Sequence, residues 1–98
     1  MSQAITADQR EKAAAIFRAL SDPGWLQILL ILADGERSVG QLAELEGGKT
    51  GTVSARLQLL LNARLVKRRR EAQSVIYAIA DDHVLNLIRN AIDHASEH

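Results

Sequence analysis

Four signals for the start of a helix divide this 98-residue chain into short segments. Each is a polar side chain that can accept hydrogen bonds from the free N–H groups of a helix start: Thr6, Asp22, Ser38, and Asp81 or Asp82. Gln9 and Gln41 stand three residues after the first and third of these, which completes two capping boxes. Pro23 directly follows Asp22, at the position where a helix tolerates a missing N–H. The sequence therefore predicts one mainly helical domain spanning residues 1–98.

Apolar residues at helical spacing predict five helices, over about residues 7–20, 23–33, 38–45, 50–63 and 83–96. Gly35 ends the second helix, and Gly47 with Gly48 ends the third just before the fourth begins. Two helices joined by so short a turn have the helix-turn-helix arrangement.

A β-hairpin is predicted between the fourth and fifth helices. Residues 65–70 and 74–79 are extended by composition, and the polar residues 71–73 form a turn between them. Val75, Tyr77 and Ile79 alternate with their neighbours along the second strand. A hairpin in this place is a wing, so the predicted fold is a winged helix-turn-helix in the order α-α-α-α-β-β-α.

The basic residues are concentrated in one segment, although the net charge is zero. Residues 49–70 hold seven of the twelve basic side chains and none of the twelve acidic ones. This segment covers the fourth helix and the first strand of the wing, which can contact double-stranded DNA together. The predicted DNA contacts lie in the first half of that helix and along the wing: Lys49, Thr50, Thr52, Ser54, Arg56, Arg68, Arg69, Arg70 and Gln73.

Two enzymatic interpretations fail, each for a different reason. The run Gly-Lys-Thr at 48–50 resembles the end of a P-loop, but the glycine required five residues earlier is Ala43. Asp93, His94 and Ser96 could be read as a catalytic set, but they lie at the chain end with no pocket or oxyanion donors evident around them. We therefore predict no enzymatic activity and no small-molecule substrate.

A cytoplasmic location without membrane contact is expected. No unbroken apolar run is longer than the one over residues 28–33, which is far short of the roughly 20 residues that a spanning helix needs. The first twelve residues carry four charges and no apolar segment typical of a secretory signal.

Histidine and carboxylate side chains cluster on the predicted fifth helix, in a chain without cysteine. His83 and His94 are eleven residues apart, so they share one helix face but lie about 16 Å apart along the axis. Asp81 stands two residues before His83, and Glu97 stands three residues after His94. One helix cannot bring both pairs to a single metal ion.

A second copy of the helix would solve this problem. In an antiparallel homodimer, the His83 end of one chain meets the His94 end of the other. The helix offers an apolar stripe for such a contact: Val84, Ile88, Ala91 and Ala95. Each dimer would then hold two sites, each with Asp81 and His83 from one chain and His94 and Glu97 from the other. Four nitrogen and oxygen ligands suit Zn(II), with Co(II) or Ni(II) as alternatives.

Other interpretations of this cluster stay open. The histidines can be ordinary solvated side chains, with Asp81 serving only as a helix cap. His98 could replace or supplement Glu97 as a ligand, and Asp93 is a weaker substitute.

Several stretches of the chain support a more specific interpretation: residues 17–23, 26–29, 38–43, 52–54 with 57, and 75–77. On these residues, and over nearly its whole length, the chain resembles the ArsR/SmtB family of winged-helix repressors. Asp81, His83, His94 and Glu97 match the fifth-helix metal motif of the zinc-sensing members at each position. The family's thiolate sensors have cysteine at the positions of Ser38 and Gly40, so that type of sensor is not expected.

The chain also departs from the family pattern. Gly24 and Trp25 stand where the family usually has Thr-Arg, and Lys49 replaces the usual serine cap. Gly48 replaces an apolar residue of the turn, and Gly51 and Ala55 weaken the polar face of the fourth helix. The resemblance implies a homodimer that binds an imperfect inverted repeat without metal and leaves it when zinc binds, which derepresses genes for metal efflux or sequestration. The alternative is the same DNA-binding repressor without a metal response.

Overall fold

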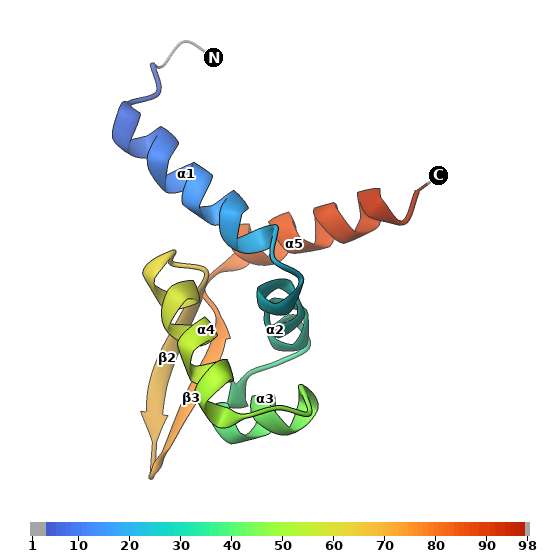
Figure 1. The fold of residues 1–98 in the computed structure, drawn as a ribbon. Helices are drawn as coiled ribbons and strands as arrows, with labels where there is room; N and C mark the ends of the chain where they lie inside the picture. Colours follow the sequence, from blue (N-terminus) through green and yellow to red (C-terminus); the bar gives the residue numbers. More distant parts are fainter. Residues whose placement is uncertain (1–3, 98) are drawn as a thin grey trace.

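The structure is a computed structural model and describes residues 4–97. Within this range the chain forms five helices and a small sheet (Figure 1). The helices are α1 (Ala7–Leu20), α2 (Pro23–Ala33), α3 (Val39–Leu45), α4 (Thr50–Asn62) and α5 (Asp82–Ala95). The strands are β1 (Arg37–Ser38), β2 (Val66–Glu71) and β3 (Ser74–Ile79). The predicted winged helix-turn-helix is confirmed.

The helix starts are where the capping residues predicted them. Thr6 Oγ1 accepts a hydrogen bond from Gln9 N at 3.0 Å, and Gln9 Oε1 accepts one from Thr6 N at 2.9 Å. Ser38 caps α3 in the same reciprocal way. Asp22 and Asp81 cap α2 and α5, since their carboxylates accept from backbone N–H groups of the first turn. Local side-chain chemistry therefore sets these four boundaries.

The predicted hairpin is part of a three-stranded antiparallel sheet, with the strands in the order β1-β3-β2. The short strand β1 was not predicted from the sequence, and it pairs Arg37 with Tyr77 of β3. The predicted turn was one residue too long, because Glu71 belongs to β2 and pairs with Ser74. The remaining two-residue turn contains Ala72, whose φ is +54°.

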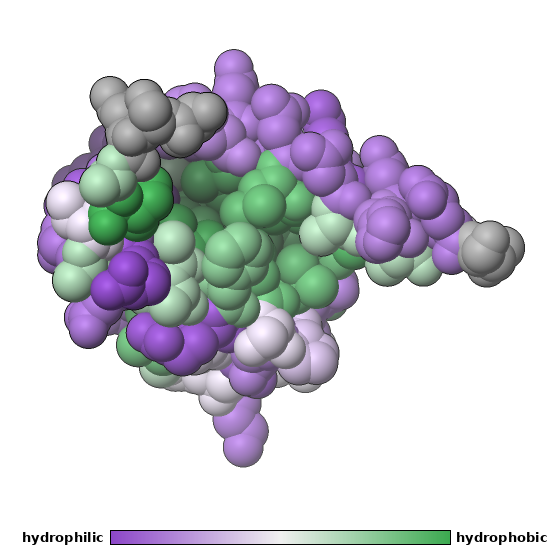
Figure 2. Space-filling model, turned by 90° about the horizontal axis from the view of Figure 1, so that it is seen from above, coloured by the Kyte–Doolittle hydropathy of each residue, from purple (hydrophilic) through white to green (hydrophobic). Residues whose placement is uncertain are grey.

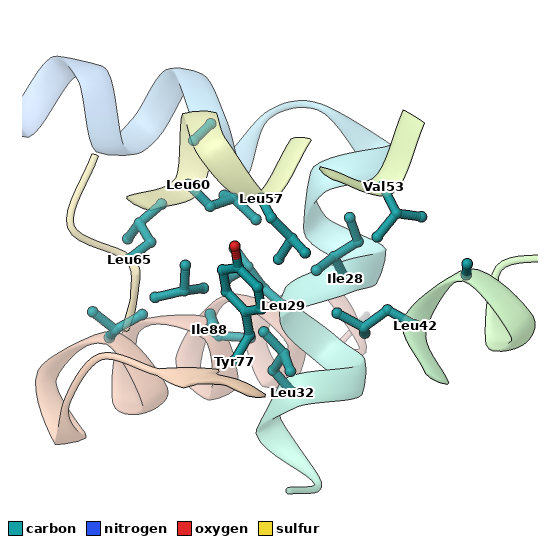
Figure 3. Close-up of a cluster of buried hydrophobic side chains, with 14 residues drawn as sticks. Ile28, Leu29, Leu32, Leu42, Val53, Leu57, Leu60, Leu65, Tyr77 and Ile88 are labelled. Carbon is teal, nitrogen blue, oxygen red and sulfur yellow. The ribbon is translucent and has the colours of Figure 1, made fainter. Parts of the chain in front are cut away.

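Helix α2 runs through the middle of the core (Figure 3). Its residues Ile28 and Leu29 are fully buried, and side chains from α3, α4, β3 and α5 surround them. Tyr77 of β3 and Ile88 of α5 belong to this same cluster, so the wing and the last helix are anchored to one core.

Two helices project from this core. Figure 1 shows α1 and α5 diverging from a common base, on the side opposite the tip of the wing. The radius of gyration is 14.5 Å, whereas a compact domain of this length has about 13 Å. Figure 2 shows hydrophobic side chains gathered in a hollow between the two projecting helices. Phe17 of α1 leaves 62% of its surface exposed, which a single copy of the chain does not bury.

No single helix within residues 4–97 is long and apolar enough to cross a membrane. Helices α1 and α2 meet the length and hydropathy criteria only as a pair, and an 89° bend separates them.

Candidate functional site

A short turn positions α4 against α3. Gly47 takes a φ of +62° after α3, and its N–H bonds to Glu44 O while Gly48 N–H bonds to Ala43 O. These bonds close the helix end and leave one residue, Lys49, before α4 begins. The predicted helix-turn-helix is therefore formed by α3 and α4.

The wing tip lies beside α4. Ser54 of α4, Gln73 at the turn of the hairpin and Gly40 of α3 line one surface hollow. Two predicted contact elements, the recognition helix and the wing, thus meet on one side of the molecule.

Most of the predicted DNA contacts are exposed on these elements. The exposed ones are Lys49, Thr50, Thr52, Ser54, Arg68, Arg69, Arg70 and Gln73. Along β2, Arg68 and Arg70 share a strand face with the buried Val66, and Lys67 and Arg69 point to the other face. The two faces of the wing strand therefore carry different cations.

Arg69 is engaged within the chain, which the sequence did not predict. Its guanidinium donates two hydrogen bonds to the carboxylate of Glu36, at 2.7 and 2.8 Å, and one to Glu71. The hydrogen bond from Arg69 holds the pKa of Glu36 below its usual value of 4.5, and the two carboxylates raise the pKa of Arg69. Arg69 therefore connects β2 to the segment before β1, and its contact with DNA stays a prediction.

Arg56 is also turned toward the protein. Its side chain is 35% exposed, and Nη1 lies 3.9 Å from Oε1 of Glu46, the residue that ends α3. Arg56 therefore lies against Glu46 in the single chain, and its contact with DNA stays a prediction.

The four predicted metal ligands form two pairs at opposite ends of α5. His83 Nδ1 lies 3.8 Å from Asp81 Oδ1, and His94 Nδ1 lies 3.8 Å from Glu97 Oε1. The histidine side chains are 98% and 87% exposed. No group of three or more such side chains in residues 4–97 lies close enough together to hold a metal ion. His98, the alternative ligand, lies outside the described residues.

The predicted dimer stripe is wrong in its first half. Val84 and Ile88 are buried in the core of their own chain, because α5 packs against α2 and β3. Ala91 and Ala95, further along the same stripe, are exposed. The face that carries the histidines is adjacent, and Leu87 lies on it between them.

The sequence did not reveal the acidic partners of Arg56 and Arg69, which are Glu36, Glu46 and Glu71. Glu36 is 33 positions from Arg69, so no local spacing could link them. Glu71 lies two residues from Arg69, and this spacing places both on one face of a strand, but the residue was assigned to the turn.

Several known proteins are similar to this chain in sequence and architecture. The sequence profile of the arsR family of bacterial regulatory proteins matches residues 22–68. The transcriptional repressor SmtB homolog of Synechocystis sp. is 39% identical over 95 residues, which cover 97% of this chain and 72% of that protein. A cadmium resistance transcriptional regulatory protein CadC homolog of Staphylococcus aureus is 36% identical over 85 residues, which cover 86% of this chain and 70% of the relative.

A solved structure extends the match to the whole fold. The homodimeric winged helix-turn-helix DNA-binding domain of Mb0332 from Mycobacterium bovis superposes with a TM-score of 0.91 at 36% identity, covering 100% of this chain and 93% of that one. These relatives are regulators and not enzymes, in agreement with the prediction. With this identity and coverage, and with α3, α4 and the wing arranged as a DNA-binding unit, the chain belongs to the arsR family of bacterial regulatory proteins.

Proposed function

We propose that the chain is a homodimeric transcriptional repressor that binds operator DNA without metal and releases it when Zn(II) binds. Asp81 and His83 of one subunit would hold the ion together with His94 and Glu97 of the partner subunit. Co(II) and Ni(II) accept the same kinds of ligand and are alternative effectors. Release of the DNA would derepress genes for metal efflux or sequestration.

One observation carries this proposal. The two ligand pairs lie at opposite ends of one helix, and neither pair alone offers enough ligands to complete a tetrahedral site. An antiparallel α5 pair centred between residues 88 and 89 places His83 opposite the partner's His94. The same pairing brings Asp81 next to the partner's Glu97. The donor set of two imidazoles and two carboxylates then fits a divalent metal with a preference for nitrogen and oxygen.

The projecting helices supply the surface for this pairing. Phe17 of α1 is exposed, residues 89–97 at the end of α5 are exposed as well, and Figure 2 shows a hydrophobic hollow between the two helices. We place the dimer contact on α1 and on the α5 face that contains His83, Leu87 and His94. The Mycobacterium bovis domain of the same fold is homodimeric, which supports this assembly.

The DNA surface would be the exposed side of α4 and the wing. In the dimer, two copies of α4 about 34 Å apart would enter successive major grooves of an inverted repeat. Thr50, Thr52 and Ser54 would face base edges or phosphates, and Lys49 with the wing residues Arg68, Arg70 and Gln73 would contact the backbone.

The fold offers a route from the ligand pairs to the DNA surface. Val84 and Ile88 fix α5 to the core, and β3 ends at Ile79, only three residues before α5 begins. Joining the ends of α5 to the partner would therefore move the wing and α4 relative to the other subunit. Linkage requires that a metal that weakens DNA binding is itself bound less tightly by the DNA complex.

A mobility-shift titration with DNA from the region upstream of the chain's own gene tests this function. We expect the apo-dimer to shift the DNA and saturating zinc to abolish the shift. His83→Ala and His94→Ala should keep DNA binding and lose the zinc response, whereas the control Asn86→Ala, at an exposed position of α5, should keep both. DNA binding that persists in saturating zinc would refute release by the metal.

The second candidate is a repressor of the same DNA-binding mode without a metal response. The high exposure of His83 and His94 favours it, because solvated histidines need no ligand. Zinc titration of the purified protein by calorimetry distinguishes the two, since only the first candidate predicts two zinc ions per dimer.

A further inference from the structure

Arg56 occupies a place that only glycine leaves open. A Cβ atom added to Gly24, in the first turn of α2, would lie 2.7 Å from Cζ of Arg56 and 2.9 Å from both terminal nitrogens. Side-chain atoms do not approach so closely, so any other residue at position 24 would displace the guanidinium. Gly24 therefore serves as a seat for the end of the Arg56 side chain.

Glu46 stabilises this position of the Arg56 side chain. The Oε1 atom of Glu46 is buried and has no hydrogen-bond partner within the described residues. The guanidinium of Arg56, 3.9 Å away, is the cation that compensates this carboxylate. A buried carboxylate oxygen without a hydrogen bond or a nearby cation is costly, so the contact favours this position of the Arg56 side chain. Arg56 thus contacts α2 and α3 from its position on α4.

The same side chain stands on the side of α4 that the proposed function turns toward DNA. Lys49, Thr52 and Arg56 follow each other at intervals of three and four residues, so they share one face. A guanidinium released from Gly24 and Glu46 would add a cation to that face. Each phosphate contact made by a cation steepens the salt dependence of DNA binding by about 0.9 in the log–log slope.

We propose that Gly24 and Glu46 hold Arg56 away from DNA, so that Arg56 is a positioning residue of the recognition helix and not a phosphate contact. This inference rests on the proposed DNA surface. Its consequence is weaker sequence-independent binding, because that binding comes almost entirely from phosphate contacts.

The test is the salt dependence of DNA affinity, measured by fluorescence anisotropy on the upstream duplex and on an unrelated duplex of equal length. Gly24→Ala should release Arg56, steepen the slope by about 0.9 and raise affinity for the unrelated duplex about five- to tenfold at 0.1 M salt. Arg56→Gln should leave the slope of the wild type unchanged. The double variant with Gly24→Ala and Arg56→Gln should lose the increase, which assigns it to Arg56.

Glu46→Gln gives a second way to release the side chain without changing the seat. It should steepen the slope as Gly24→Ala does. Glu44→Gln removes the same charge from an exposed position of α3 and is the matched control, with the slope of the wild type expected. Arg70→Ala removes an exposed cation of the wing and should make the slope shallower by about 0.9. This variant is the positive control, because it shows that the assay detects the loss of one contact.

A slope that becomes shallower by about 0.9 in Arg56→Gln would overturn the proposal, because Arg56 would then contact phosphate in the wild type. An unchanged slope in both Gly24→Ala and Glu46→Gln would overturn it as well. If the wild type fails to bind either duplex, the proposed DNA surface itself is refuted. If the wild type binds but the variants have the same slope, only the proposed role of Gly24 and Glu46 is refuted.

Discussion

Arg64 takes a backbone conformation that usually belongs to glycine. It follows α4 with a φ of +62°, where its N–H bonds to Leu61 O and the N–H of Leu65 bonds to Leu60 O. Gly47 closes α3 with the same pattern of bonds and the same φ. A residue with a Cβ loses roughly 1–2 kcal/mol in this region, and the larger folding entropy of glycine offsets part of that difference.

Arg64→Gly should therefore raise the free energy of unfolding by about 0.5–1 kcal/mol, measured by urea denaturation. Arg64→Ala is the control, because it removes the charge but keeps the strained conformation, and its stability should stay within about 0.5 kcal/mol of the wild type. An equal gain in both variants would assign the effect to the charge and contradict the backbone explanation.

The ion pair of Arg69 joins the two outer parts of the small sheet. Glu36 precedes β1 and Arg69 lies on β2, so their bidentate contact spans the central strand β3. The hydrogen bond from Arg69 lowers the pKa of Glu36 from 4.5, which means that the ionised carboxylate stabilises the fold. This contribution is fully present above the unfolded pKa and is lost as the pH falls through the lower pKa of the folded state.

Glu36→Gln should lower the melting temperature at pH 7, and the difference from the wild type should disappear as the pH falls below 4.5 and through the folded-state pKa of Glu36. Thermal melts followed by circular dichroism at several pH values measure this difference. Glu44→Gln, at an exposed carboxylate of α3, controls for the change in net charge. A difference that persists undiminished at pH 2 would contradict the ion-pair account.

At the scale of helices and strands, the sequence predicts those features that depend on residues close together in the chain. The capping pairs, such as Thr6 with Gln9, identify helix starts because both partners lie within one turn. Strand β1 escaped prediction because two residues show no alternation, and its pairing with Tyr77 depends on contacts forty positions away. The orientations of Arg56 and Arg69 could not be predicted for the same reason, because their partners come from other elements.

The buried half of the α5 stripe shows the same limit. An apolar face at helical spacing predicts burial, but it does not distinguish the core of the chain from the surface of a partner. Val84 and Ile88 face the core, and the histidines lie on the neighbouring face. The positions of the four candidate ligands on α5 followed from helical geometry alone, because all of them belong to one helix or its ends.

At the scale of the whole molecule, the proposed DNA surface and the candidate metal-ligand pairs lie in different regions. The wing and α4 lie on one side, and the projecting parts of α1 and α5 lie on the other (Figure 1). The account therefore requires a second subunit, because only an antiparallel partner joins the Asp81–His83 pair to a His94–Glu97 pair.

Zinc binding by mixed dimers tests this claim most directly. A His83→Ala chain paired with a His94→Ala chain regains one complete site, whereas each variant homodimer has one histidine missing from both sites. Calorimetry on tagged and purified dimers should give two zinc ions for the wild type, one for the mixed dimer and none of comparable affinity for either homodimer. A mixed dimer that binds zinc no better than the variant homodimers, beside a wild type that binds it, would contradict a site shared between subunits.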